Sequence, residues 1–376
     1  MRAHRLLPDG APPPIAIVGT TASGKSSLAM ALARHRGDVE LVSVDSMQVY
    51  RGMDIGTAKP TRAEQAEVRH HVIDVVEPWE PFEVHSFQRA VAEALADIAE
   101  RDRRAVLVGG TGLYLQAVID GFEIPGRFPD IAAELEAEED TGALHARLVE
   151  LDPLAASRME PSNRRRIVRA LEVTLGSGRP FSSYGPGVGT RAPSPILQVG
   201  IRLPQDVVAR RIAARYDQQM ADGFLAEVER LADGPPLSRT AAQALGYREL
   251  LGFVAAQRAG EASPTQDDAL DEAVRRTRAF ARRQRSWFRR DPRITWLDAA
   301  GDPAERLPDL LELAAGHWRW HGTFGGDPPS VRRVARRVGD AGRTIGPPEP
   351  GRAEGARPPA GADALDGCGG TNPRGA

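Results

Sequence analysis

Cysteine and lysine are nearly absent from this chain of 376 residues. Its one cysteine, Cys368, excludes a disulfide framework and is typical of a protein kept in a reducing compartment. No run of about 18 apolar residues occurs, which excludes a membrane-spanning helix. The first residues have charges and prolines but no apolar core, so they do not form a secretory signal. We therefore expect a cytoplasmic protein with no membrane partner.

An excess of charge of one sign is also lacking. The chain has 49 Lys and Arg against 51 Asp and Glu, a net charge of −2. This balance excludes a polycation, so any nucleic-acid surface must be local. The basic residues are almost all arginine, and the two lysines, Lys25 and Lys59, both fall in motif-like stretches. The length allows two domains, or one domain with an insertion.

The stretch that organises the chain is IAIVGTTASGKS, at residues 15–26. Ile15 to Val18 predict a buried strand, and Leu28 and Leu32 continue at helical spacing. Between them lies the G-x-x-x-x-G-K-[ST] pattern of a phosphate-binding loop, whose backbone N–H groups surround an anion. The residues expected to bind a di- or triphosphate are Gly19, Thr20, Thr21, Ala22, Ser23, Gly24, Lys25 and Ser26. The hydroxyl of Ser26 is the expected ligand of Mg²⁺.

Strand and helix patterns alternate along much of the chain, which predicts an α/β fold with a parallel sheet. Asp45 follows one expected strand and Thr111 follows another, so both should lie near Ser26 at the carboxyl edge of the sheet. The other expected elements are strands at 40–45, 71–76, 105–108, 196–203 and 294–297 and helices at 87–100, 130–138, 142–151, 163–175, 205–232 and 266–290.

The pattern divides the chain into four parts. We expect a flexible N-terminus at 1–13, a catalytic core at 14–121 and 196–321, a mainly helical insertion at 122–195, and a disordered tail at 322–376. The tail is predicted from its Pro, Gly, Ala and Arg content and from the loss of apolar periodicity after residue 322.

Two polar positions have more than one interpretation. Asp45 could hold Mg²⁺, act as a general base, or cap the next helix. Thr111, in the run GGTG, could present its hydroxyl to a ligand or cap a helix. The stretch after Asp45 is dense in polar groups, glycine and proline, which favours ligand contact. Its polar residues are Gln48, Tyr50, Arg51, Asp54, Thr57 and Lys59.

Arginine gathers in three places. One cluster lies at 164–169 in the insertion and one at 210–215. In the third, Arg275, Arg278, Arg282, Arg285 and Arg289 recur at helical spacing, beside an inward stripe formed by Ala273, Thr277, Phe280, Gln284 and Trp287. Such an arginine face suits a phosphate backbone, although charged helix faces are usually solvated surface. The run QALGYR at 243–248 could stack on and hydrogen-bond an exposed base, or form a plain helix–turn junction.

Together these residues resemble the tRNA dimethylallyltransferase (isopentenyltransferase, IPP transferase) family. The resemblance covers residues 15–297 and depends on GTTASGKS, SVDSMQVYRGMDIGTAKP, LVGGTGLY, RRRIVRALEV, RIAARYDQQMADGFLAEV, QALGYREL and RRQRSWFRR. Thr20 stands where the family commonly has proline, and Ala132 where a basic residue is expected, with Arg127 nearby. The tail matches nothing in the family.

The resemblance implies a phosphate-loop NTPase-like fold and a prenyl transfer. Dimethylallyl pyrophosphate would give its dimethylallyl group to the exocyclic amine of the tRNA adenine just 3′ of the anticodon, with Mg²⁺ as cofactor. It implies that Asp45 is the general base and that Lys25, Thr111 and Arg215 stabilise the leaving pyrophosphate. The residues implied to face the tRNA are Asp45, Ser46, Met47, Gln48, Thr111, Arg165, Arg166, Arg169, Gln243, Gly246, Tyr247, Arg248, Arg282, Arg283, Gln284, Arg285, Trp287 and Arg289. We expect a monomer.

Three other functions remain open at this point. A small-molecule kinase would use the phosphate loop and Asp45, but leaves GMDIGTAKP and the arginine face unexplained. A transferase acting on free adenine nucleotides would not need the basic insertion. A non-catalytic RNA-binding ATPase would not need Asp45.

Overall fold

The computed structural model describes residues 7–8, 10–185, 187 and 189–321. Six parallel strands form one sheet in the order β3-β2-β4-β1-β5-β6, which confirms the predicted α/β class. The strands are β1 (Ile15–Gly19), β2 (Val39–Val44), β3 (His70–His71), β4 (Arg104–Gly109), β5 (Leu197–Arg202) and β6 (Ile294–Asp298). Since all six run in one direction, the loops that follow β1, β2 and β4 leave from the same edge of the sheet.

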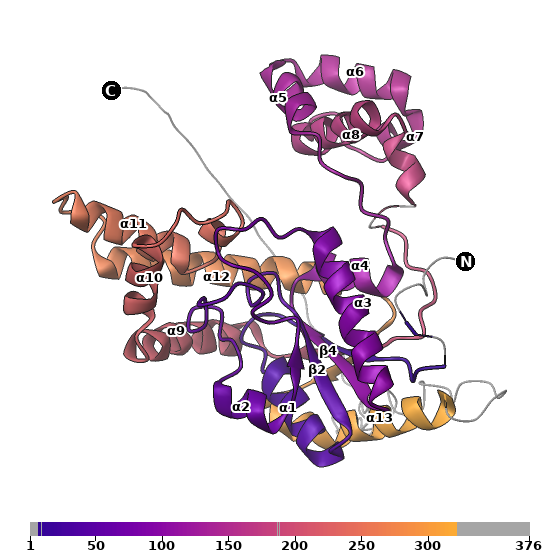
Figure 1. Cartoon of the computed structure of the whole chain (residues 1–376), viewed down its shortest axis with the longest axis vertical. Helices are drawn as coiled ribbons and strands as arrows, with labels where there is room; N and C mark the ends of the chain where they lie inside the picture. Colours follow the sequence, from indigo (N-terminus) through magenta and orange to yellow (C-terminus); the bar gives the residue numbers. More distant parts are fainter. Residues whose placement is uncertain (1–6, 9, 186, 188, 322–376) are drawn as a thin grey trace, which may run out of the picture.

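Helices cover both faces of the sheet (Figure 1). The alternation of side chains along β1 sends Ile15 and Ile17 to a core formed with α1 and α13, and sends Ala16 and Val18 to the opposite core. The helices of the main body are α1 (Lys25–Arg36), α2 (Arg62–Glu67), α3 (Val84–Glu100), α4 (Gly112–Asp120), α9 (Gln205–Ala221), α10 (Phe224–Ala232), α11 (Tyr247–Arg258), α12 (Gln266–Phe288) and α13 (Leu307–His321).

A second group of helices stands apart from the sheet, at the top of Figure 1. They are α5 (Pro129–Ala137), α6 (Thr141–Leu151), α7 (Pro153–Ala156) and α8 (Arg164–Ser177). This helical lobe has its own hydrophobic cluster, in which Leu144, Leu148 and Ile167 are buried. Residues 122–195 thus contain mainly helix, as expected, while the division of the chain into domains stays a prediction.

Two expected elements are wrong in extent. The strand expected at 71–76 ends at His71, because Val72 and Asp74 take positive φ angles of 60° and 53° and turn the chain out of the sheet. The helix expected at 205–232 is two helices, α9 and α10, since Gly223 has a φ of 96° between them.

The sequence interpretation also missed short helices and the last one. No helix was expected at α2, α4, α11 or α13, although Thr61 and Glu64 form a capping box that marks the start of α2. The N-terminal segment is fixed at its end, because Trp318 Nε1 donates to the Pro13 carbonyl at 3.3 Å. The predicted disordered tail at 322–376 lies outside the described residues. Over the residues that are described, no helix combines the length and the apolar character needed to cross a membrane.

Candidate active site

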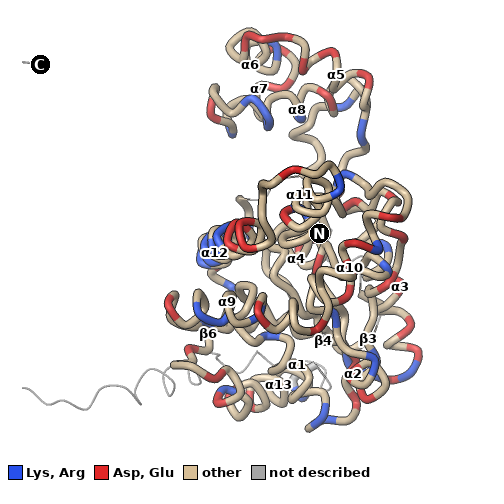
Figure 2. Tube along the Cα trace, turned by 90° about the vertical axis from the view of Figure 1, so that its left-hand side faces the viewer, with Lys and Arg blue, Asp and Glu red and all other residues tan. Residues whose placement is uncertain are grey.

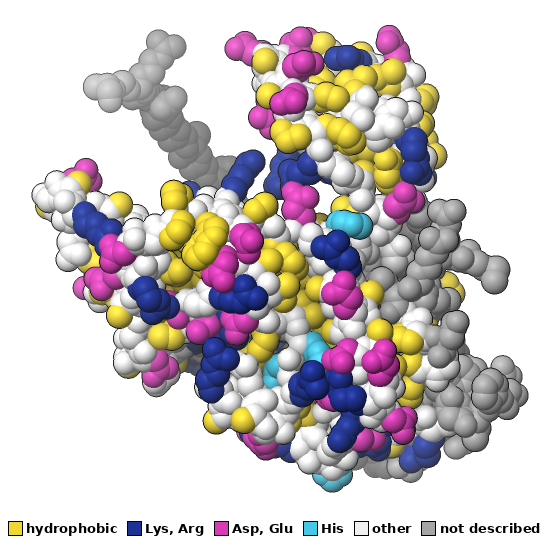
Figure 3. All heavy atoms as spheres, viewed as in Figure 1, with side chains coloured by type: hydrophobic (Ala, Val, Ile, Leu, Met, Phe, Trp, Pro, Cys, Tyr) yellow, Lys and Arg dark blue, Asp and Glu magenta, His cyan; other side chains and the backbone are white. Residues whose placement is uncertain are grey.

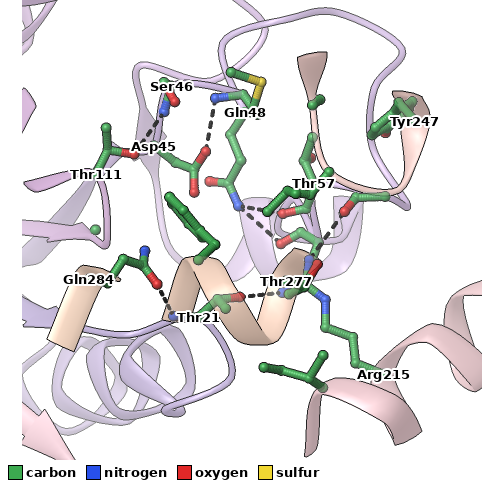
Figure 4. A pocket seen from close by; sticks show the side chains of 18 of the residues that line it. Thr21, Asp45, Ser46, Gln48, Thr57, Thr111, Arg215, Tyr247, Thr277 and Gln284 are labelled. Carbon is green, nitrogen blue, oxygen red and sulfur yellow. Dashed lines mark hydrogen bonds between the residues drawn. The ribbon is translucent and has the colours of Figure 1, made fainter. Parts of the chain in front are cut away.

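A cavity of about 330 Å³ lies at the carboxyl ends of β1, β2 and β4. Lys25 and Ser26 reach it from the first turn of α1, which follows β1. Asp45 reaches it from the end of β2 and Thr111 from the end of β4 (Figure 4). Arg215 of α9 lines it from another side. The structure therefore places at one cavity the polar residues that the strand ends were expected to bring together.

The loop at 19–26 is tightly turned. Gly24 has a φ of 79°, and a Cβ atom there would lie 2.1 Å from Pro303 Cγ, so only glycine fits. Helix α1 begins within this segment, at Lys25, so the positive end of the helix dipole points at the cavity. Ser23 N donates to Thr20 O at 3.2 Å within the loop. A glycine turn that leads into a helix N-terminus is the arrangement expected of an anion-binding loop.

Two half-buried cations and a carboxylate line this cavity. Burial lowers the pKa of Lys25 to about 8; Asp45 opposes this shift and Arg215 adds to it. Burial also lowers the pKa of Arg215, whose guanidinium donates to Thr21 Oγ1 at 3.3 Å and to Gly56 O at 3.2 Å. An anion with more than one charge would relieve the desolvation of both cations.

Asp45 and Thr111 are not simple helix caps. Asp45 Oδ1 accepts a hydrogen bond from Met47 N at 2.8 Å, which orients the carboxylate at the cavity wall. Thr111 occupies the N-cap position of α4, but its side chain makes no capping hydrogen bond. Instead Thr111 Oγ1 accepts from Ser46 N at 3.4 Å (Figure 4). Of the interpretations left open, the geometry favours ligand contact for both residues.

The segment at 54–56 is held by a residue that the sequence interpretation missed. Glu227 of α10 is buried, and its Oε2 accepts from Asp54 N and Ile55 N, both at 3.0 Å. Its Oε1 accepts from Gly56 N at 3.3 Å and from Tyr247 Oη at 2.5 Å. The sequence offers no local signal for this role, because the partners meet only in the folded chain.

Lys59 is part of the same support and not of the cavity. Its side chain is 2% exposed, and Nζ donates to Asp54 Oδ1 at 2.5 Å, Asp74 Oδ1 at 2.6 Å and Tyr50 O at 2.7 Å. The interpretation of Tyr50, Arg51, Asp54 and Lys59 as ligand contacts finds no support in these positions, since none of the four lines the cavity. Gln48 and Thr57 from the same stretch do line it.

The residues predicted to face tRNA lie in three places. Most of those from the strand ends, with Gln243, Tyr247, Arg283 and Gln284, line the cavity. Arg165 and Arg166 are exposed on α8, while Arg169 donates to Glu172 at 2.7 Å and to the Pro125 carbonyl at 2.9 Å. In Figure 2 the basic segments of α8 lie on the side of the lobe that faces the main body.

The arginine face of α12 is largely exposed. Arg282, Arg283 and Arg289 are exposed, and Arg285 donates to Leu203 O at 3.2 Å. Figure 2 shows basic residues clustered along α12, whereas Figure 3 shows acidic and basic side chains interspersed on the face viewed there. In the inward stripe Ala273, Thr277 and Gln284 are buried, as expected. Arg248 and Gly246 lie outside the cavity lining: Arg248 donates to Gln243 Oε1 at 3.0 Å, and Gly246 is the N-cap residue of α11.

The donor set at the cavity fits Mg²⁺ carried in by a phosphate ligand. Among the residues that the structure describes, no group of three or more His, Cys, Asp or Glu could hold a metal ion. Mg²⁺ keeps several waters and takes phosphate oxygens, so one hydroxyl such as that of Ser26, with Asp45 beside it, is a sufficient protein contribution.

The sequence and the fold of this chain are similar to those of one known family. A family model described as IPP transferase matches residues 48–291, and one described as isopentenyl transferase matches residues 15–77. The tRNA dimethylallyltransferase of Salinispora tropica is 50% identical over 294 residues, which covers 76% of this chain and 88% of that protein. The crystal structure of the full-length tRNA isopentenylpyrophosphate transferase from Bacillus halodurans superposes with a TM-score of 0.60 at 36% identity, covering 83% of this chain and 98% of that one.

Proposed function

This chain belongs to the tRNA dimethylallyltransferase family and transfers a dimethylallyl group to tRNA, and we propose that the cavity beside the phosphate loop is where that transfer takes place. The observation that carries the proposal is the convergence of Lys25, Ser26, Asp45, Thr111 and Arg215 on that one cavity. One site thus contains basic groups that can bind a leaving pyrophosphate and a carboxylate that can accept a proton.

The loop at 19–26 would hold the pyrophosphate of dimethylallyl pyrophosphate. Lys25, Arg215 and the loop amides neutralise the charge that grows as the carbon–oxygen bond breaks. Thr111 would add a hydroxyl donor to the same anion. The hydroxyl of Ser26 would help to hold Mg²⁺, which would supply Lewis-acid stabilisation of the leaving group. No nucleotide is hydrolysed in this scheme.

Asp45 would be the general base. The acceptor is the exocyclic amine of the adenine 3′ of the anticodon, whose lone pair is delocalised into the ring. As the new bond forms between this nitrogen and the allylic carbon, the carbon–oxygen bond breaks, and the electron pair leaves with pyrophosphate. The nitrogen loses a proton to the Asp45 carboxylate. The base must leave its stack to reach the cavity.

The exposed arginines of α8 and α12 would bind the tRNA backbone outside the cavity. Arg282→Ala with Arg285→Ala should weaken tRNA binding and flatten its dependence on salt, because fewer counterions are released. An unaltered salt slope would make α12 an ordinary charged surface.

We further propose that the protein is a cytoplasmic monomer. Analytical sedimentation would measure its mass in solution.

The test incubates purified protein and Mg²⁺ with dimethylallyl pyrophosphate and an unmodified tRNA that has adenine after its anticodon. Mass spectrometry of the digested RNA should find prenylated adenosine, and none with AMP as acceptor. Prenylation of AMP would overturn the tRNA acceptor. Asp45→Ala should abolish transfer while tRNA still binds; unchanged turnover in this variant would remove Asp45 from the role of base.

A further inference from the structure

Gln284 of α12 joins two loops of the active site by both ends of its amide. The side chain is buried, and its Oε1 accepts from Thr21 N at 2.8 Å (Figure 4). Its Nε2 donates to the Gly110 carbonyl at 2.8 Å. An N–H needs an acceptor and a carbonyl needs a donor, so the two partners fix which way the amide points. Both polar ends of the side chain are thus used within the protein.

The glycines of the GGTG run make room for this contact. A Cβ atom on Gly110 would lie 2.5 Å from Gln284 Nε2, and one on Gly112 would lie 2.4 Å from Trp287 Cδ1. Since real Cβ atoms do not approach so closely, α12 packs against this turn only because both residues are glycine. The turn carries Thr111 between these two glycines.

Thr21 is held from a second side as well. Its hydroxyl accepts from Arg215 at 3.3 Å, while its N–H donates to Gln284. The phosphate loop is therefore fixed at one residue by α9 and by α12, and Gln284 extends the link to the Gly110 carbonyl, next to Thr111.

We propose that Gln284 is a positioning residue that sets the phosphate loop against the Gly110–Gly112 turn, and that it acts on pyrophosphate binding and not as a contact to tRNA. This rests on the proposed function, in which the loop and Thr111 hold one leaving group from two sides. A donor that is displaced by even a fraction of a bond length loses much of its effect on the transition state. Truncating Gln284 would also leave the Thr21 N–H and the Gly110 carbonyl without their partner.

The test compares Gln284→Met, which keeps the length of the side chain and removes both hydrogen bonds, with Gln257→Met at an exposed site on α11. Titration calorimetry of the full chain with Mg²⁺ and inorganic pyrophosphate should show at least tenfold weaker binding for Gln284→Met and unchanged binding for Gln257→Met. Affinity for unmodified tRNA should stay within about twofold of wild type.

Two further variants keep the test decisive. Gln284→Glu keeps an acceptor for Thr21 N but sets a negatively charged oxygen against the Gly110 carbonyl and beside the anion, so it should bind pyrophosphate more weakly than wild type and no better than Gln284→Met. Gly110→Ala displaces the amide by itself, so adding Gln284→Met to it should cost little more. If Gln284→Met does not fold, these two variants still give the comparison.

Normal pyrophosphate binding with weakened tRNA binding in Gln284→Met would overturn the proposal and make Gln284 a tRNA contact. The proposed function fails separately. If Lys25→Met also leaves pyrophosphate binding intact, the loop does not hold the anion. If Lys25→Met abolishes binding while the Gln284 variants retain it, only the positioning role is wrong.

Discussion

The two motif-bearing loops of this protein, residues 19–26 and 54–59, use their polar groups in opposite ways. In the first, Lys25 and Ser26 line the cavity, and burial holds the pKa of Lys25 at about 8. In the second, the three amides at 54–56 all donate to Glu227, and the ammonium of Lys59 is enclosed by Asp54, Asp74 and the Tyr50 carbonyl. The charged and polar side chains of the first loop face the cavity, whereas the amides at 54–56 and the ammonium of Lys59 are bound by other groups of the protein.

A family-specific stretch therefore need not touch the substrate along its whole length. GMDIGTAKP is the most distinctive run of the chain, yet its lysine serves to hold the turn that presents Gly56, Thr57 and Ala58 to the cavity. The two lysines make the contrast testable, because the same substitution should remove activity at one site and stability at the other.

Lys25→Met should have the largest effect, a fall of about 10³-fold in kcat/KM, since it deletes a charge that stabilises the leaving pyrophosphate. Its melting temperature should not fall, because burial opposes the charged form of Lys25 in the free protein. Steady-state kinetics and thermal melting measure the two quantities. A melting temperature that drops by several degrees would show that Lys25 also supports the fold.

Lys59→Met should reverse that pattern. The substitution removes the buried ammonium that pairs with Asp54 and Asp74, and the two carboxylates then repel each other. We therefore expect the free energy of unfolding to fall by about 2–3 kcal/mol. The figure is below that for a fully buried pair because the Asp54 side chain is 49% exposed. Denaturant unfolding measures it. Full stability with abolished pyrophosphate binding would instead make Lys59 a ligand contact.

The pH dependence of the first loop gives the next effect. With a pKa of about 8, Lys25 loses its proton as the pH rises past 8, so kcat/KM for dimethylallyl pyrophosphate should fall about fiftyfold between pH 8 and pH 10. In the unfolded chain the pKa of Lys25 returns to its ordinary value of 10.5. Between pH 8 and 10.5 the unfolded chain therefore holds a proton on Lys25 that the folded protein has lost. The contribution of this group to stability therefore rises with pH over that range while activity falls.

Lys25→Arg is the control for this profile, since a guanidinium stays charged throughout. Its residual activity should lose the descending limb above pH 8. A limb that persists unchanged would assign the titration to another group.

The sequence predicted what is local. The loop at 19–26 and its flanking strand and helix follow from spacing within a dozen residues, and Asp45 and Thr111 follow from their places after strands. The strand at 71–76 was overextended because its apolar residues look like a strand, whereas the chain turns at Val72 and Asp74. Periodicity carries no information on that turn.

The contacts that hold the site could not be predicted in the same way. Thr21 meets Gln284 263 positions later in the chain, and Asp54 meets Glu227 173 positions later. Helical spacing placed Gln284 in the inward stripe, where it is buried, and the family resemblance implied a tRNA contact, but neither indicated the two loops that its amide joins. Only the folded chain shows which side chains of a helix reach a given loop.

Tyr247→Phe should give the smallest effect, and it decides between two roles for one residue. QALGYR suggested a ring that stacks on a base, but Tyr247 is 0% exposed, packs edge-on against Phe224 with ring centroids 4.9 Å apart, and donates its hydroxyl proton to Glu227. Burial and the Glu227 carboxylate both raise the pKa of Tyr247, so the hydroxyl keeps the proton that it donates. Losing that one hydrogen bond should cost about 1–1.5 kcal/mol of unfolding free energy, because Glu227 still accepts three amides and the ring still fills its place. Transfer to tRNA should stay within about threefold of wild type.

Unaltered stability with a hundredfold loss of transfer would return Tyr247 to the base-binding role. The residues that contact the ligand would then include one that holds the loop at 54–59, and not only those of the loop at 19–26.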